Sequence, residues 1–331
     1  MYDIHNHIIP DIDDGAEHLD MSVEMLEMAA AQGISHMVLT PHLHVGRYSQ
    51  TKQEIYAAFR QLERDLFDRG VHEPQLAVAA EIRFNEYTQE AVMNQEVPYL
   101  GQWEGDRVLL LEWPAGSVPP TALPFCQWLR DQRIRPLIAH PERNRDVQKN
   151  YKVLKPYVEM GCLFQLTSAS IIGRLGDRIQ RISRKLVEME WVHVVASDAH
   201  HPIRRPPDLQ QGYETLVSWV GSKKAKQFVY DNPRAITKSL FKVRGDTPRK
   251  PPPEKPKPND QEPADKTARA SDQGGVFETM AVVNAVNHLD ELVREQIGGL
   301  KRAWWQMALA SALVGGLAGG MIFWAFWVWL T

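Results

Sequence analysis

Short hydrophobic runs recur through the first 200 positions, and segments with helical periodicity separate them. The runs are rich in aliphatic and β-branched residues, which is typical of buried strands. We expect strands over seven segments: 2–4, 36–39, 76–80, 108–111, 136–139, 162–166 and 192–196. Helices are predicted over 19–32, 52–69, 121–132, 147–160 and 178–189, several of which end just before a glycine.

This alternation defines the expected fold of residues 1–244. Seven strands separated by helices favour an α/β fold in which parallel strands close, or nearly close, into a TIM-like barrel. In such barrels the functional side chains stand at the C-terminal ends of the strands. The residues that directly follow each run therefore become the first candidates for chemistry.

The pattern changes completely at residue 245. Residues 245–275 contain seven prolines, many charges and no aliphatic side chain larger than alanine. Such a segment cannot bury enough apolar area to offset its ordering entropy, so we expect a disordered, proline-rich linker. Apolar residues at spacings of three and four then predict an amphipathic juxtamembrane helix within 276–302.

Residues 303–330 carry no charge and include five tryptophans near the two ends. Twenty-eight residues exceed the ~20 that a helix needs to cross a bilayer, so we expect a transmembrane helix. Lys301 and Arg302 precede it and nothing basic follows. The positive-inside rule, together with an N-terminus that lacks a signal peptide, predicts a tail anchor in the cytoplasmic membrane with the catalytic domain in the cytoplasm. Overlapping glycine pairs, Gly315 with Gly319 and Gly316 with Gly320, are compatible with a homo-oligomer.

The charge and the cysteine content exclude some classes of function. Domains that bind nucleic acids are usually basic, so the formal net charge of −3 argues against a nucleic-acid partner. Cys126 and Cys162 are the only cysteines, which excludes a disulfide-stapled scaffold and any zinc site built on a CxxC pair.

Metal-ligand residue types follow six of the seven predicted strands. A histidine in the core of a strand is common, but histidines and carboxylates at matching ends of successive strands indicate a shared site. The candidate ligands are His5, His7, Asp14, His42, Glu81, Glu112, His140, Asp198 and His200.

Nine nitrogen and oxygen donors without a thiolate suit Zn²⁺, Mn²⁺ or Fe²⁺, and their number suggests more than one ion. Neighbouring metal ions that share a water activate it and stabilise the attacking and leaving oxygens of a phosphoester. Arg143 and Arg205 lie shortly after two of the ligands and are placed to bind phosphate oxygens. Arg47 is a third, weaker candidate for this role.

Several sequence motifs together resemble those of a known superfamily. DIHNHIIPDIDDGA (3–16), TPHLHVGRY (40–48), the Glu81–Arg83 pair, HPERN (140–144), TSASIIGRLG (167–176) and SDAHHPIRRPP (197–207) are similar to the polymerase-and-histidinol-phosphatase (PHP) superfamily. More closely, they resemble its bacterial manganese-dependent tyrosine phosphatases of capsular and exopolysaccharide loci. The resemblance covers about residues 1–241.

This resemblance implies a distorted seven-stranded PHP barrel that holds three divalent ions, Mn²⁺ first and Zn²⁺ or Fe²⁺ as alternatives. It implies three ligand groups: His5, His7, Glu81 and Asp198; Glu81, Glu112 and His140; Asp14, His42 and His200. Asp13 is an adjacent rival for the role of Asp14, and Arg143 and Arg205 match the phosphate-binding arginines.

The implied reaction is hydrolysis of phosphotyrosine on a membrane tyrosine autokinase that controls capsule or exopolysaccharide synthesis. A metal-bridging hydroxide would attack phosphorus in line, and His200 or a metal-bound water could assist as general acid.

Two alternatives remain open. The domain could be a PHP-type or TatD-like phosphoesterase for histidinol phosphate or DNA. It could instead be a non-catalytic, membrane-anchored scaffold that keeps its metal site for stability.

Overall fold

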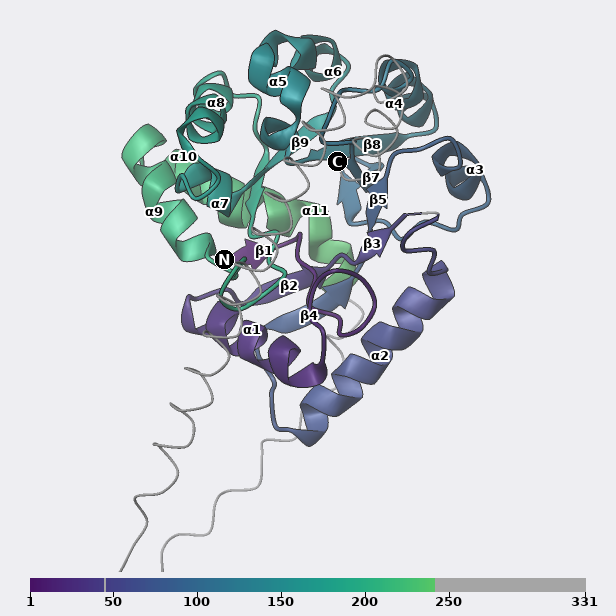
Figure 1. Cartoon of the computed structure of the whole chain (residues 1–331), viewed down its shortest axis with the longest axis vertical. Coiled ribbons are helices and arrows are strands. Elements are labelled where there is room, and N and C mark those ends of the chain that lie inside the picture. Colours follow the sequence, from purple (N-terminus) through teal and green to yellow (C-terminus); the bar gives the residue numbers. More distant parts are fainter. Residues whose placement is uncertain (45, 242–331) are drawn as a thin grey trace, which may run out of the picture. The chain divides into compact units, whose positions relative to one another are not determined.

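The computed structural model describes residues 1–44 and 46–241 (Figure 1). The predicted linker, juxtamembrane helix and transmembrane helix, residues 245–330, lie outside the described residues. Within the described part of the chain, no helix has both the length and the apolar character that a membrane crossing requires.

The strands of the described residues are β1 (Tyr2–Asp3), β2 (His36–Leu39), β3 (His42–Leu43), β4 (Gln75–Val78), β5 (Glu81–Arg83), β6 (Gly101–Trp103), β7 (Asp106–Glu112), β8 (Ile134–Ala139), β9 (Leu163–Thr167) and β10 (Val194–Ala196). Each of the seven predicted runs contains a strand with small shifts in its bounds, and the described residues hold three further strands, β3, β5 and β6, that were not predicted.

The helices lie mainly around the strands (Figure 1). They are α1 (Leu19–Ala31), α2 (Lys52–Asp68), α3 (Thr88–Met93), α4 (Ala122–Asp131), α5 (Arg145–Lys149), α6 (Lys155–Glu159), α7 (Ser168–Ile171), α8 (Asp177–Glu188), α9 (Leu209–Val220), α10 (Ser222–Lys226) and α11 (Asn232–Phe241). Two short 3₁₀ helices are η1 (Pro141–Arg143) and η2 (Tyr151–Leu154), and a π-helical turn is η3 (Gln227–Asp231).

The strands form two sheets that continue one another. One has the order β1-β2-β4 and the other β10-β9-β8-β7-β5-β3, and all these neighbours pair in parallel. β6 lies off this path and pairs with β7 in the antiparallel direction. β3 resumes the path of β2, and β5 resumes that of β4, with the backbone bond from Glu81 N to Pro41 O beside the break. At the other end Asn6 bridges Ala199. The predicted α/β class with a parallel sheet is therefore confirmed.

One predicted helix is divided in the structure. The segment 147–160 contains α5, η2 and α6 in place of a single helix. Asn150 adopts an extended conformation (φ −151°) and its side chain accepts a hydrogen bond from Lys152 N, which begins a new turn. Pro156 lies in the first turn of α6, where its missing N–H costs nothing, whereas it would break a continuous helix.

The core has two layers because strand residues alternate in direction. On β7, Val108 and Leu110 belong to the cluster that the strands enclose, whereas Leu109 and Leu111 pack in the larger cluster beneath the helices. Ile236 of α11 joins the enclosed cluster. A Cβ at Gly101 would lie 2.2 Å from the carbonyl oxygen of Ile236, so only glycine allows α11 to pack this closely against β6. This packing supports the strands at their N-terminal ends.

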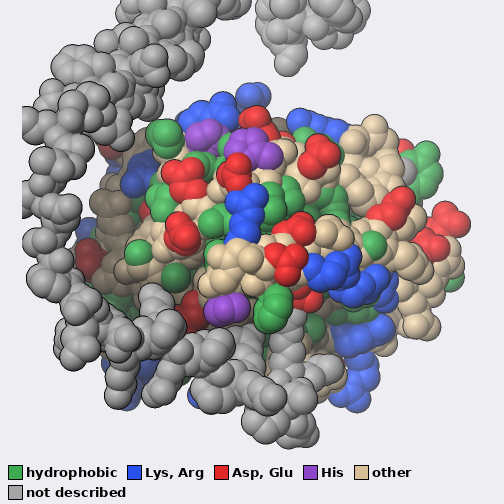
Figure 2. All heavy atoms as spheres, turned by 90° about the horizontal axis from the view of Figure 1, so that it is seen from below, with side chains coloured by type: hydrophobic (Ala, Val, Ile, Leu, Met, Phe, Trp, Pro, Cys, Tyr) green, Lys and Arg blue, Asp and Glu red, His purple; other side chains and the backbone are tan. Residues whose placement is uncertain are grey.

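Charged side chains of both signs are interspersed on the face shown in Figure 2, with small hydrophobic areas between them. This mixture accords with the small net charge of the chain. No field of a single sign dominates the visible described surface.

His193, just before β10, makes the stability of the fold depend on pH. Burial lowers its pKa from 6.5 to about 4, so between these values the unfolded chain binds a proton that the folded chain does not. The free energy of unfolding should therefore decrease as the pH falls from 6.5 to 4, by at most about 1.4 kcal/mol per pH unit. We expect His193→Gln to reduce this loss, measured by urea unfolding at pH 7 and pH 5 with chelator present. An unchanged difference between the two pH values would contradict this role.

Candidate metal centre

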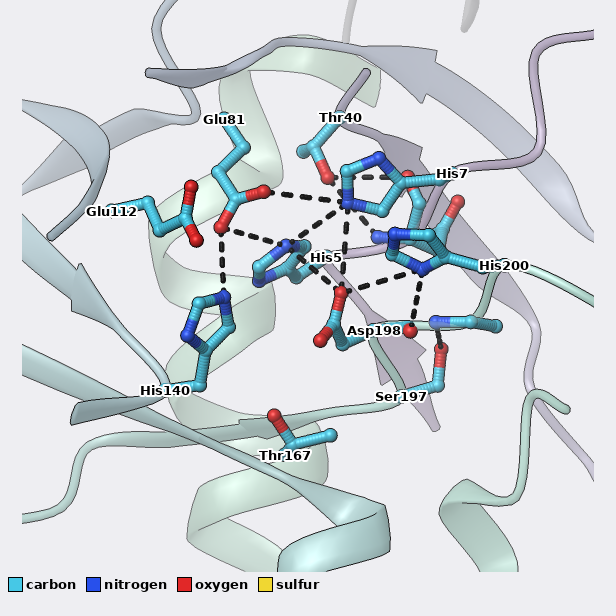
Figure 3. Close-up of polar contacts among 12 residues, drawn as sticks. His5, His7, Thr40, Glu81, Glu112, His140, Thr167, Ser197, Asp198 and His200 are labelled. Atoms are coloured by element: carbon cyan, nitrogen blue, oxygen red, sulfur yellow. Dashed lines mark hydrogen bonds and ion pairs between the residues drawn. The ribbon is translucent and has the colours of Figure 1, made fainter. Parts of the chain in front are cut away.

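All nine predicted ligands converge beyond the C-terminal ends of β1, β2, β4, β8 and β10 and at the end of β7, and Figure 3 shows most of them. β1 leads into His5 and His7, β8 into His140, and β10 into Asp198 and His200. Three more residues lie on strands and one in the loop before α1: His42 on β3, Glu81 at the start of β5, Glu112 at the end of β7, and Asp14. His5 and His7, like Asp198 and His200, are near neighbours in the sequence, and the strand order brings these pairs together with the other ligands.

The donor atoms form four overlapping groups, and within each group they lie within 4.8 Å of one another. The groups are His7, Asp14, His42 and His200; His5, Glu81 and His140; His5, His7 and Asp198; and His42, Glu81 and Glu112. Asp14 is exposed, His42 and Glu112 are partly buried, and the other six are buried.

Two ligands stand on strained backbone. His140 (φ +31°), directly after β8, and Asp198 (φ +53°), two residues after the end of β10, adopt left-handed conformations. Non-glycine residues rarely occupy this region, and those that do are concentrated at functional sites. The chain turns sharply at both positions, and Figure 3 shows both side chains directed toward the centre of the cluster.

The histidine tautomers show that the cluster suits a cation. His5 Nδ1 lies 2.8 Å from Gln165 Oε1, and His7 Nδ1 lies 2.7 Å from Asp13 Oδ2, so both Nδ1 atoms donate. In their neutral forms both Nε2 atoms then carry lone pairs, yet they lie only 3.4 Å apart. Lone pairs this close repel unless a positive charge lies nearby. The residues present therefore fit divalent metal ions.

Glu81 lies at the centre of the cluster. Its carboxylate oxygens are 2.9 Å from His140 Nε2 and 2.9 Å from His42 Nδ1, with His5 and His7 slightly farther away. Burial alone would raise its pKa, but His5 and His42 hold it well below the ordinary value. The carboxylate is thus ionised and has imidazoles on both sides, an arrangement suited to bridging two ions.

The same charges act on the histidines of the metal-free cluster. Burial would lower the pKa of His5, but Glu81 and Asp198 raise it to about 9. His42 behaves similarly, and its pKa rises to about 11 because Glu81 and Asp14 outweigh desolvation. Metal binding must therefore displace protons from these imidazoles.

The structure separates Asp13 from Asp14. Asp13 accepts hydrogen bonds from His7 Nδ1, from the backbone N–H of His42 and from that of Gly15. Asp14 lies 3.4 Å from His42 Nε2 and 3.6 Å from His200 Nε2, and its hydrogen bond with His42 lowers its pKa. Asp14 is therefore the ligand candidate, and Asp13 orients His7. Sequence reasoning missed the orienting roles of Asp13 and of Gln165.

Two of the candidate arginines contact the same carboxylate of the cluster. Arg143 and Arg205 both donate to Asp198 Oδ2, and their side chains remain about one third exposed. Arg47 makes no such contact, because its guanidinium lies over the ring of Tyr48. Arg83, whose role the sequence left open, forms an ion pair with Glu112 at 2.5 Å.

A buried carboxylate supports Arg143. Glu142 accepts hydrogen bonds from the backbone N–H of Thr167 and from Ser170 Oγ, and these bonds attach the turn η1 to β9 and α7. The HPER segment thus places His140 in the cluster and Arg143 at its edge within one rigid turn.

Asp13→Asn should weaken metal binding by about tenfold to a hundredfold, because His7 loses the charged acceptor that fixes its ring. Calorimetric titration of the metal-free protein with Mn²⁺ measures this directly. Asp11→Asn is the matched control, since Asp11 is exposed on the same loop. Equal metal affinity in the two variants would show that Asp13 does not act through His7.

Comparison with known proteins places this site in a family. A family model described as capsular polysaccharide synthesis, CpsB/CapC, matches residues 1–238. The chain is 32% identical over 213 residues to the putative tyrosine-protein phosphatase CapC of Staphylococcus aureus, over 64% of this chain and 81% of that protein. It is 35% identical over 224 residues to the tyrosine-protein phosphatase YwqE of Bacillus subtilis, over 67% of this chain and 86% of that protein.

A solved structure gives the same result. It is described among crystal structures of YwqE from Bacillus subtilis and CpsB from Streptococcus pneumoniae, called unique metal-dependent tyrosine phosphatases. The match has a TM-score of 0.67 and 31% identity, and covers 72% of this chain and 95% of that chain. The chain belongs to the CpsB/CapC family of capsular polysaccharide synthesis.

Proposed function

We propose that this chain is a metal-dependent phosphatase that hydrolyses phosphotyrosine in proteins. The observation that carries the proposal is the cluster of nine nitrogen and oxygen ligands with two arginines on one of its carboxylates. The family relatives named tyrosine-protein phosphatases support it. The fold that we assign to residues 1–244 is the distorted seven-stranded PHP barrel.

We assign three divalent ions to the cluster, with Mn²⁺ as the preferred metal. The group of Asp14, His42 and His200, joined by His7, supports one of the three ligand sets, and the central position of Glu81 supports its sharing between the other two. When bound, such ions polarise phosphoryl oxygens and supply a nucleophilic water at neutral pH.

Arg143 and Arg205 bind the phosphoryl group. Asp198 keeps both guanidiniums at the edge of the cluster, and their other N–H groups remain available for phosphate oxygens. Burial and the neighbouring His7 lower the pKa of His200 to about 3, so its imidazole is neutral near pH 7, as a metal ligand must be. Tyrosine has a pKa of about 10 and leaves without strong acid help, so a proton from His200 is not required.

Substrate selection tests this proposal against its alternatives. We expect the protein to release phosphate from a phosphotyrosine peptide at least about a hundredfold faster than from the matched phosphoserine peptide, histidinol phosphate or DNA, because the relatives are tyrosine phosphatases. Faster turnover of histidinol phosphate or DNA would favour the other phosphoesterases. No turnover, with His140→Ala indistinguishable from the parent protein, would favour the scaffold.

We further propose that the substrate is a membrane-bound tyrosine autokinase and that residues 303–330 anchor the phosphatase in the same membrane. The uncharged, tryptophan-flanked sequence of that segment supports the anchor. Sharing one membrane raises the effective concentration of enzyme near its substrate. Deletion of residues 276–331 should leave the hydrolysis of a small phosphoester unchanged and slow the dephosphorylation of a kinase in vesicles. Equal rates on the kinase would contradict the anchor.

A further inference from the structure

A short hairpin follows the ligand candidate His42. Two backbone bonds of 2.8 Å join His44 and Tyr48 in both directions, and Arg47 N also donates to His44 O. Gly46 lies in this turn with φ +93°, a conformation that glycine adopts without strain. The position of Arg47 and Tyr48 is therefore fixed relative to β3.

The ring of Tyr48 contacts two flat groups, the imidazole of His42 and the guanidinium of Arg47. The ring of Tyr48 lies parallel to that of His42, with an interplanar angle of 7° and a centroid distance of 5.5 Å. The guanidinium carbon of Arg47 lies 5.0 Å from the centroid of the Tyr48 ring. Tyr48 thus contacts both His42, a partly buried ligand candidate, and Arg47, which is exposed.

Tyr48 and Arg47 are accessible from the surface, and the charge of Arg47 favours contact with a ligand. Tyr48 is half-buried and Arg47 is exposed, and among the described residues no carboxylate forms an ion pair with the Arg47 guanidinium. Arg143 and Arg205, whose charge would hold a phosphate, stand beside the same cluster. A phosphate bound there would direct its organic group outward, because the ligands behind it, His5, Glu81 and Asp198, are buried.

We infer that Tyr48 and Arg47 form an aromatic-selective wall that receives the phenyl ring of the substrate, an inference that rests on the proposed function. Aromatic rings pack favourably in offset or edge-to-face contact with one another and on the plane of a guanidinium. An alkyl phosphoester, such as phosphoserine, is too short and too narrow to make this contact. The wall thus contributes to the choice of phosphotyrosine, separately from the metal and phosphate contacts.

The experiment measures the binding of phosphonates, which are not hydrolysed, so the result does not depend on the quality of a leaving group. Inhibition constants of phenylphosphonate and methylphosphonate are determined for the metal-loaded full chain and for Tyr48→Leu, Tyr48→Phe and Arg47→Lys. Tyr48→Leu should weaken phenylphosphonate about tenfold and leave methylphosphonate within about twofold. Tyr48→Phe should retain the parent affinity for both, because it keeps the ring. Arg47→Lys, which keeps the charge and loses the planar group, should weaken only phenylphosphonate.

Two outcomes would overturn the inference. Equal weakening of both phosphonates in Tyr48→Leu would show that Tyr48 acts only through His42, and metal content measured in parallel would then fall. No change in either constant would show that the ring does not contact Tyr48. Failure of the proposed function can be distinguished from failure of this inference. In that case the parent protein would not hydrolyse phosphotyrosine, whatever the phosphonate constants are.

Discussion

Replacement of Glu81 by Gln is expected to lower kcat/KM for a phosphotyrosine peptide by about a thousandfold or more, or ~4 kcal/mol of transition-state stabilisation. The amide keeps the shape of the side chain and removes the charge that lies within 3.4 Å of His5, His7, His42 and His140. No other described carboxylate has so many imidazoles around it. Loss of this charge should weaken more than one metal position at once.

The measurement combines steady-state kinetics with the metal content of the purified variant. Glu104→Gln provides the matched control, because Glu104 is exposed and pairs with Arg135 near the N-terminal start of β7. The control should retain activity and metal content. Parent-level activity in Glu81→Gln would exclude a central role for this carboxylate.

Arg143→Met should lower kcat/KM about a hundredfold, since the phosphoryl group loses a bidentate, charge-assisted partner. Arg205→Met should have a comparable effect. Combining them should cost less than the product of the two single effects, because both guanidiniums contact the same oxygen of Asp198 and, by our proposal, the same phosphate.

Arg204→Met is the control for charge alone. Arg204 neighbours Arg205 in sequence, its side chain is 73% exposed, and its nearest acidic partner is 4.0 Å away. A loss of activity in Arg204→Met equal to that in Arg205→Met would indicate that general surface charge, rather than a specific contact, attracts the substrate.

Most of the fold was predictable because the strands are short, apolar and separated by well-marked helices. Helix α2 shows this clearly, since Thr51 and Glu54 form a capping box at its start and Gly70 follows its end. The breaks between β2 and β3 and between β4 and β5 could not be predicted. They arise from tertiary pairing between Glu81 and Pro41, which hydrophobic periodicity does not encode.

The site was predictable to the extent that its ligands follow strands. Each ligand type at a strand end could be found without knowing the strand order. Gln165 could not, because its role depends on β9 directing this side chain inward and on β1 lying opposite, 160 residues away. The contacts of the arginines could not be predicted from the sequence for the same reason. Arg47 was placed with the phosphate but contacts Tyr48, whereas Arg83, two positions after Glu81, reaches Glu112 only because β5 and β7 are neighbours.

The central claim is that this cluster catalyses metal-dependent hydrolysis of phosphotyrosine. The most direct test strips the purified full chain with chelator, restores Mn²⁺, Zn²⁺ or Mg²⁺ separately, and measures phosphate release from a phosphotyrosine peptide. The account predicts no activity after stripping and recovery with Mn²⁺ that Arg143→Met largely abolishes. A folded, metal-loaded protein that releases no phosphate with any of the three ions would contradict it.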